Sequence, residues 1–127
     1  MVEKIIKGIK YRLNEKTMTA EVIAKRNGYE GDIIIPETVV SNRASFLVTS
    51  IGENAFFSCK SLTEITIPGS VKSLGHDVFS NCISLKTITY NGTQEKWKKI
   101  KKDTLADKWI SGIPAKFVQC TDGLVKI

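Results

Sequence analysis

The 127-residue sequence predicts a mainly β fold with short helices, in which short coils stack into a solenoid. Three observations predict this class. One segment recurs after 23 residues, its strand-like parts alternate apolar and polar residues, and both ends of the chain depart from the repeat. Apolar residues make up 42% and charged residues 25%, so we expect one domain with a core of its own.

The clearest repeat relates residues 50–66 to residues 73–89. Four residue types recur at an offset of 23, in the pairs Gly52 and Gly75, Phe56 and Phe79, Cys59 and Cys82, and Leu62 and Leu85. A period of 23 falls in the range of leucine-rich repeats, whose coils bury their apolar rows only when they stack. The repeat therefore predicts a short leucine-rich repeat solenoid.

Two looser copies flank this pair. Residues 33–39 parallel residues 65–71 at an offset of 32, so the first coil is expected to carry about nine extra residues, at 41–49. A partial copy begins at 88–90 but has Asn91 where the others have proline.

Each coil is expected to lay down one short strand, at 62–67 and at 85–90. Alternation along the first of these strands places Leu62, Ile65 and Ile67 inward and leaves the intervening polar residues outward.

Other positions of the repeat have predicted roles outside the strands. Phe56 and Phe79 should return inward from a short helical turn. Gly52 and Gly75 should mark turns that need a positive φ, which glycine adopts without strain. Pro68 should end its strand, because proline has no backbone N–H to donate.

The pattern Ile-x-Ile-Pro-x-x-Val, followed by Ile/Leu-Gly, Ala/Val-Phe, Cys and Leu, resembles the BspA-like leucine-rich repeat family over residues 33–92. The opening segment 9–36 and the closing segment 90–123 also resemble the ends of such proteins. The resemblance implies a bacterial protein that is displayed on the cell surface or secreted. It also implies binding of protein or glycan partners, host-derived ones included.

The chain is expected to form a single domain, 1–127, with three parts. An N-terminal hairpin cap covers 1–31, the leucine-rich repeats cover 32–92, and a C-terminal helix-plus-strand cap covers 93–127. Solenoids need such caps because the outermost coils would otherwise leave apolar rows uncovered.

The N-terminal cap is predicted as two strands, 9–13 and 19–24, joined by a turn at 14–17. In the C-terminal cap, Thr93 should begin a helix in which Trp97 faces the last coil. Further apolar residues should continue this cover: Ile100, Leu105, Trp109 and Ile110. A final strand is expected at 117–120.

The outward strand residues form the candidate partner-binding surface, which consists of Ile34, Glu64, Thr66, Thr87 and Thr89. Repeat proteins use such extended faces to bind partners, but a plain polar sheet face is the favoured interpretation here. The insertion, 41–47, is a second candidate, because insertions in repeats tend to form loops on one face. In the family that the chain resembles, such an insertion often forms a local hairpin.

The cysteines and the histidine offer weaker candidates. Cys59 and Cys82 should stack in successive coils, either as a redox pair or metal site or, preferably, as buried thiols beside the phenylalanines. Cys120 is expected in the core of the last strand. His76 occupies the position of Glu53 in the previous repeat, so we expect a solvent-facing side chain without a catalytic partner.

The formal net charge is +6, and much of the excess comes from one lysine cluster, formed by Lys96, Lys98, Lys99, Lys101 and Lys102. The cluster either binds nucleic acid or forms the solvated face of the cap. The second interpretation is favoured because Trp97, the only aromatic residue in it, is assigned to the core. The sequence 91–93 fits a glycosylation acceptor, but a turn is preferred there.

No motif predicts chemistry. The sequence has no phosphate-binding glycine loop, metal-ligand spacing or nucleophile motif, so we expect neither an enzyme nor a cofactor or metal. No apolar run is long enough for a membrane span. The expected function is therefore a non-catalytic binding or adhesion module, acting as a monomer. The chain begins with Met1 and no secretory signal, which favours an intracellular interaction scaffold in the cytoplasm as the alternative.

Overall fold

The computed structural model describes residues 1–102 and 109–127, and its strands form two sheets. The first, which we call sheet A, has the order β1-β2-β3-β6-β8-β10, with β5 paired to β6. Its strands are β1 (Val2–Ile6), β2 (Ile9–Asn14), β3 (Thr19–Val22), β5 (Thr38–Ser41), β6 (Ala44–Ile51), β8 (Ser73–Leu74) and β10 (Lys101–Lys102).

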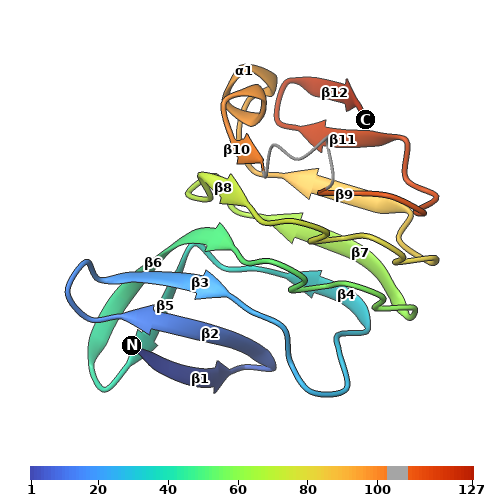
Figure 1. Cartoon of the computed structure of the whole chain (residues 1–127). Helices are drawn as coiled ribbons and strands as arrows, with labels where there is room; N and C mark the ends of the chain where they lie inside the picture. Colours follow the sequence, from blue (N-terminus) through green and yellow to red (C-terminus); the bar gives the residue numbers. More distant parts are fainter. Residues whose placement is uncertain (103–108) are drawn as a thin grey trace.

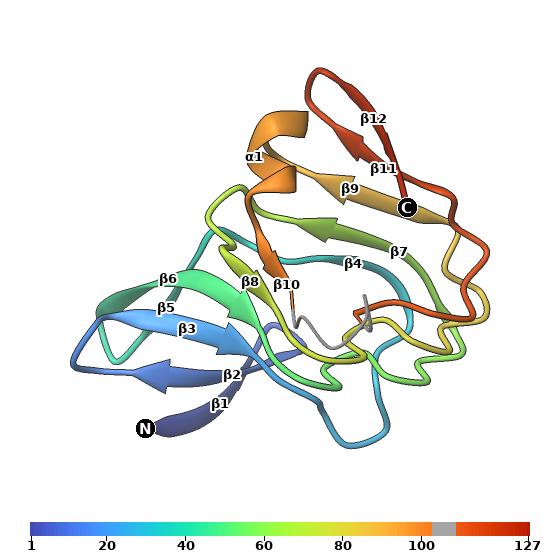
Figure 2. The same cartoon turned by 45° about the horizontal axis from the view of Figure 1, so that its top comes forward.

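The second sheet, which we call sheet B, has the order β12-β11-β9-β7-β4. Its strands are β4 (Gly31–Ile34), β7 (Leu62–Ile67), β9 (Thr87–Tyr90), β11 (Phe117–Cys120) and β12 (Gly123–Lys126). Figure 1 shows the chain crossing from sheet A to sheet B once in each coil, and Figure 2 shows the two ladders side by side.

Parallel pairing stacks the coils in both sheets. In sheet A, β3 pairs with β6, β6 with β8, and β8 with β10. In sheet B, β4 pairs with β7, β7 with β9, and β9 with β11. A strand in sheet A followed by a strand in sheet B thus recurs four times along the chain. This arrangement confirms the short leucine-rich repeat solenoid predicted from the 23-residue period.

The pairing places three strands of the predicted caps within the ladders, β3 at one end and β10 and β11 at the other. The division of a single domain into an N-terminal cap (1–31), repeats (32–92) and a C-terminal cap (93–127) stays a proposal. The pairing leaves β1 and β2 outside the stack at its first end, and it leaves β12 outside the stack at the other.

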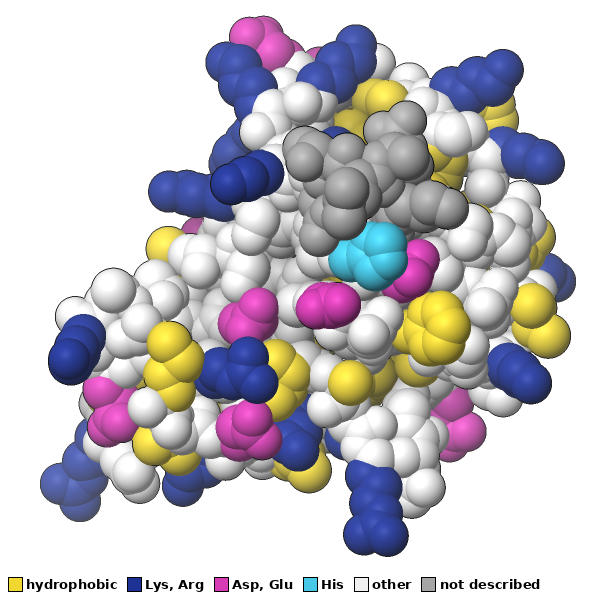
Figure 3. Space-filling model, viewed as in Figure 1, with side chains coloured by type: hydrophobic (Ala, Val, Ile, Leu, Met, Phe, Trp, Pro, Cys, Tyr) yellow, Lys and Arg dark blue, Asp and Glu magenta, His cyan; other side chains and the backbone are white. Residues whose placement is uncertain are grey.

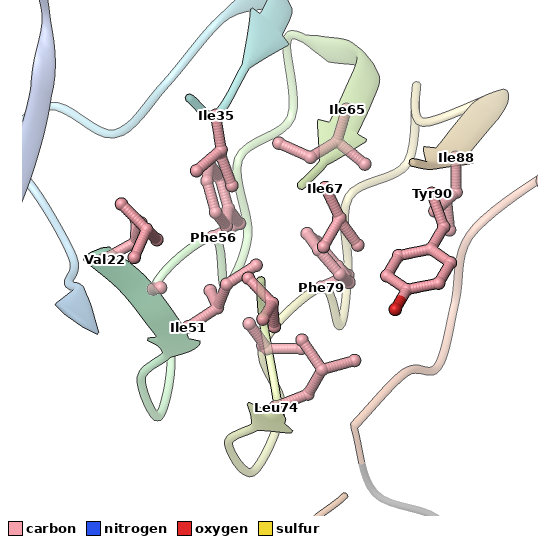
Figure 4. Close-up of a cluster of buried hydrophobic side chains, with 14 of the residues drawn as sticks. Val22, Ile35, Ile51, Phe56, Ile65, Ile67, Leu74, Phe79, Ile88 and Tyr90 are labelled. Carbon is pink, nitrogen blue, oxygen red and sulfur yellow. The ribbon is translucent and has the colours of Figure 1, made fainter. Parts of the chain in front are cut away.

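The core lies between the two sheets, where aliphatic side chains from both meet (Figure 4). Leu62, Ile65 and Ile67 are all fully buried, as predicted, but alternation accounts only for Ile65 and Ile67. Leu62 reaches the same side because the register of β7 against β4 shifts by one residue between Leu62 and Glu64. Ile51 and Leu74 approach from sheet A (Figure 4). Burial of such side chains stabilises the fold by roughly 1.5–3 kcal/mol each relative to exposure.

A column of aromatic rings runs through the stacked turns that connect the sheets. The ring centroids of Tyr29 and Phe56 are 4.7 Å apart, those of Phe56 and Phe79 are 5.4 Å apart, and those of Phe79 and Trp109 are 6.2 Å apart. The backbone repeats with the rings, since the Phe56 N–H donates to the Val78 carbonyl and the Phe79 N–H to the Trp109 carbonyl. The inward position of both phenylalanines is confirmed.

The predicted positive φ angles at the two repeat glycines, Gly52 and Gly75, are wrong, and these positions need glycine for a different reason. Neither Gly52 nor Gly75 has a positive φ. A Cβ on Gly75 would collide with the backbone N of Glu53, and one on Gly52 would lie 3.2 Å from the Val22 carbonyl oxygen. Glycine is therefore needed because the coils approach closely here. The positive φ angles occur at other turn residues: Asn54, Ser58, Asp77 and Asn81.

The N-terminal segment contains more strand than predicted. β2 and β3 form the expected hairpin, whose turn is held by the Asn14 side chain accepting from the N–H groups of Lys16 and Thr17. The additional strand β1 pairs antiparallel with β2.

The insertion folds back as the hairpin of β5 and β6, with positive φ at Asn42 and Arg43, as two-residue hairpin turns require.

The C-terminal segment begins with the predicted capped helix, α1 (Gln94–Lys98). The Thr93 hydroxyl accepts a hydrogen bond from the Lys96 N–H, and Trp97 is buried in the core. Ile100 and Trp109 are buried as well, whereas Leu105 lies outside the described residues. The strand predicted at 117–120 is confirmed as β11, and β12, which was not predicted, pairs with it.

Candidate functional site

The candidate surface lies on the outer face of sheet B. Ile34 comes from β4, Glu64 and Thr66 from β7, and Thr87 and Thr89 from β9. Strand pairing aligns them in two rows across the sheet. Ile34 is opposite Thr66, which is opposite Thr89, and Glu64 is opposite Thr87. The structure thus brings the five residues together on one face.

Sequence reasoning missed the continuation of these rows on both sides. Asp32 extends the row of Glu64, and Gln119 extends the row of Thr89. Phe117 and Leu124 are 46% and 54% exposed at the far end of the sheet. Alternation within Phe117-Val-Gln-Cys is the signal that points to the first of them, because Val118 and Cys120 are buried.

The face combines threonine hydroxyls in its centre with larger apolar side chains towards its ends. Neighbouring strands lie about 4.8 Å apart, so the row from Ile34 to Gln119 spans about 14 Å. Hydroxyls donate and accept hydrogen bonds, and Ile34, 64% exposed, offers apolar contact. This chemistry fits recognition of an extended surface better than enclosure of a small molecule.

Among residues 1–102 and 109–127, the two carboxylates of this face differ from those on sheet A in having no ion-pair partner. On the outer face of sheet A, Arg12 pairs with Glu3 at 3.3 Å and with Glu21 at 3.1 Å. The hydrogen bond from Arg12 lowers the pKa of Glu3. Within the described part of the chain, Asp32 and Glu64 make no ion pair. A partner that binds to the outer face of sheet B therefore does not have to break an ion pair of either carboxylate.

The three cysteines are buried free thiols. The Cys82 thiol donates to the Phe56 carbonyl oxygen at 2.9 Å, and burial raises its pKa to about 12. Burial also raises the pKa values of Cys59 and Cys120. Because the thiolate is the reactive and metal-binding form, this environment favours the interpretation of the thiols as packing residues. Over residues 1–102 and 109–127, no cluster of His, Cys, Asp or Glu could hold a metal ion.

His76 is less exposed than expected. Its side chain is 31% exposed, and its Nε2 lies 3.1 Å from a carboxylate oxygen of Asp77. The Ser80 hydroxyl donates to the other carboxylate oxygen at 2.7 Å. Ser80 is buried and bonds to the aspartate rather than to the histidine, so the three side chains do not form a nucleophile activated by a base.

The lysine cluster divides into two parts. Lys96, Lys98, Lys99 and Lys101 are exposed, and Lys99 pairs with Glu95 at 3.4 Å. Lys102 instead lies over the Trp97 ring, 4.8 Å from its centroid. The clustered lysines therefore present charge without exposed aromatic rings for base stacking, as the sequence predicted from the placement of Trp97 in the core.

The face shown in Figure 3 carries acidic side chains in its middle, in contrast to the lysine cluster. Asp and Glu side chains and the histidine gather there, while Lys and Arg side chains lie mostly around the rim. A shallow cavity of about 400 Å³ lies over Gly52 and Gly75, and its lining carries both charges, from Glu21, Glu53, Lys101 and Lys102. Close approach of the coils at the two glycines explains the hollow, so we assign it no ligand.

Residues 33–111 match the family described as the BspA type leucine rich repeat region, in six copies. The match covers more than half of the chain, which therefore belongs to this family. The leucine-rich repeat fold indicates a protein-interaction module, a class that is typically non-enzymatic. A search of curated proteins gives no match.

Solved structures share the fold. A leucine rich cell surface protein from Faecalibacterium prausnitzii is 25% identical, with a TM-score of 0.64 over 96% of this chain and 32% of that protein. A leucine-rich repeat protein from Bacteroides capillosus is 20% identical, with a TM-score of 0.64 over 94% of this chain and 99% of the other. One from Bacteroides ovatus is 24% identical, with a TM-score of 0.61 over 92% of this chain and 33% of the other.

The chain spans about a third of the length of two of these three proteins. Among the described residues, no helix has the length and apolar character needed to cross a membrane.

Proposed function

We propose that this chain is a non-catalytic adhesion module that binds a protein partner at the cell surface through the outer face of sheet B. The observation that carries the proposal is the alignment of Ile34, Thr66 and Thr89 in one row, beside the carboxylate of Glu64, which makes no ion pair with any residue that the structure describes. The description of the F. prausnitzii relative as a cell surface protein supports the location.

A protein partner is favoured over a glycan by the composition of the face. Glycan sites usually present aromatic rings for the sugar faces, and here Phe117 lies only at the edge of the rows. Threonine hydroxyls with an exposed isoleucine suit the backbone and apolar side chains of a protein surface.

The test is binding of the purified chain to immobilised extracellular matrix proteins, with a glycan array as the second arm. Thr66→Arg and Thr89→Arg place a bulky charge in the middle of the row, and we expect each to weaken protein binding by about tenfold or more. Thr17→Arg, in the exposed turn before β3, is the matched control and should bind like the unmodified chain.

Binding that survives in both row variants would overturn the proposed face, and binding to the glycan arm alone would overturn the partner class. Protease shaving of intact source cells tests the location, and recovery of the chain only from the cytosol would favour the intracellular scaffold. Affinity that falls steeply with salt, and that is lost with Lys98→Glu, would instead favour nucleic acid.

A further inference from the structure

Sheet B has a free edge at each end. Its order begins with β12 and ends with β4, and in the described part of the chain no further strand pairs beyond either one. Figures 1 and 2 place the two strands at opposite ends of the solenoid. A free strand edge presents unpaired N–H and C=O groups that can pair with another strand.

The free groups of β4 can be assigned from its bonds to β7. The Ile35 N–H donates to the Thr66 carbonyl, so Ile33 and Ile35 direct their backbone groups into the sheet. In a parallel pair the alternate residues point the other way, so Asp32 and Ile34 present theirs at the edge. The side chains of both are exposed on the outer face.

An apolar cavity of about 330 Å³ lies beside this edge. Its lining comes from β4, the β1–β2 hairpin and β5, and includes Ile34, Ile6, Ile9 and Val39. An added strand with an apolar side chain near Ile34 would cover this cavity.

The free groups of β12 can be assigned from its bonds to β11. The Ile127 N–H donates to the Lys116 carbonyl, so Ile127 and Val125 bond to β11. Leu124 and Lys126 therefore present their backbone groups at the opposite edge of the sheet. Both side chains are exposed on the outer face.

The two edges are complementary in direction, hydrogen bonding and side chains. β12 runs antiparallel to β11, and β4 runs with the parallel ladder, so copies stacked in one orientation bring β12 antiparallel to β4. One register of that alignment puts Asp32 opposite Lys126 and Ile34 opposite Leu124, because both pairs consist of residues whose backbone groups point to the edge. Each facing pair has its backbone groups directed at the other, as hydrogen-bonded antiparallel pairs require.

We propose that a second copy of this chain is the partner of the β4 edge, and that β12 of one copy pairs with β4 of the next, head to tail. In this arrangement Lys126 pairs with Asp32, Leu124 covers the apolar cavity beside Ile34, and sheet B continues from copy to copy. The contact uses different surfaces on the two copies, so it produces an open chain rather than a closed dimer. It does not rest on the proposed function, which uses the face of the sheet.

Sedimentation velocity over a concentration series of the whole chain tests the proposal. We expect the weight-average mass to rise from 14.1 kDa and to pass the dimer mass without a plateau. Asp32→Lys and Lys126→Glu each replace the attraction by repulsion and should lower the association constant by about fivefold or more. The double variant Asp32→Lys/Lys126→Glu restores the opposite charges and should restore association.

Glu15→Lys and Lys16→Glu, in the exposed β2–β3 turn, are the matched charge controls and should associate like the unmodified chain. Leu124→Lys adds a test that does not depend on the ion pair and should also weaken association. Circular dichroism shows that each variant is folded. A chain that stays monomeric at millimolar concentration, a plateau at the dimer mass, or single charge variants that associate unchanged would each overturn the proposal.

Discussion

The Phe79 ring lies within the aromatic column, between those of Phe56 and Trp109, and is fully buried. Phe57, the next residue after Phe56, is 44% exposed. The neighbouring residues Phe56 and Phe57 differ in burial because only the position of Phe56 in the turn faces the space between the sheets. At the residue scale, stability is therefore expected to depend on turn position more than on residue type.

We expect Phe79→Ala to lower the free energy of unfolding by about 3–5 kcal/mol, because the cavity would open between two ring contacts. Phe57→Ala is the matched control and should change it by less than about 0.5 kcal/mol. Urea denaturation followed by tryptophan fluorescence measures both. A loss below about 1 kcal/mol for Phe79→Ala would contradict the packing of the column.

Burial raises the pKa of Cys82 to about 12, from an ordinary value of 9.0. Between these pH values the unfolded chain loses a proton that the folded chain keeps, so the free energy of unfolding should fall as pH rises. Tyr11, whose pKa burial also raises to about 12, contributes in the same direction from pH 10 upward.

The measurement for this prediction is urea denaturation at several pH values between 7 and 11. Cys82→Ala removes one of the contributing groups and should make the decline of stability with pH less steep. An unchanged slope in Cys82→Ala would show that the thiol ionises equally in the folded and unfolded chains.

At the scale of the element, the turn between the two sheets depends on close backbone approach and on left-handed residues. Gly75 has no room for a Cβ beside Glu53, and Asn54 holds a φ of 60°. Asparagine adopts this conformation more readily than most residues, so the sequence can place a side chain there. Asn54 follows Glu53 in one coil, and Gly75 lies in the next coil and approaches Glu53, so the two demands meet where successive coils touch.

Gly75→Ala should lower the free energy of unfolding by about 1–3 kcal/mol, because the added methyl meets backbone that cannot move aside cheaply. Glu53→Ala removes the exposed side chain and keeps the backbone, so it serves as the control.

At Asn54, the Asn54→Ala variant should lower the free energy of unfolding by about 1 kcal/mol and Asn54→Gly by less, because only glycine accepts the positive φ freely. Thermal and urea unfolding measure all four variants, and an unaffected Gly75→Ala would contradict the close approach.

At the scale of the whole molecule, stability is distributed along a stack in which each coil contacts its neighbours. β7 and β9 pair on both sides, whereas β1, β4 and β12 pair on one side only. A repeat stack opens from its ends, since the terminal strands lose fewest contacts on leaving.

Hydrogen exchange followed by mass spectrometry should therefore find the slowest amides in β7 and β9 and faster exchange in β1, β4 and β12. The experiment is run at low protein concentration, where self-association does not protect the edges. Protection of β4 equal to that of β7 in the dilute sample would contradict an end-opening stack.

The sequence alone predicted the inner coils in detail. The period of 23 identified the fold, and the apolar residues of the predicted strand, Leu62, Ile65 and Ile67, are the ones that the structure buries. It also identified five residues of the outer face, because the two faces of a strand alternate locally. That these five residues bind a partner stays a prediction.

Only the tertiary structure decided what depends on pairing between distant segments. Tyr29 and Trp109 join the aromatic column at offsets that differ from 23, so the repeat did not reveal them. The extra strands β1, β10 and β12 carry weak local signals and become strands through their neighbours. Gly52 and Gly75 are required by the approach of adjacent coils rather than by their own φ, because steric room is set by packing and not by local sequence.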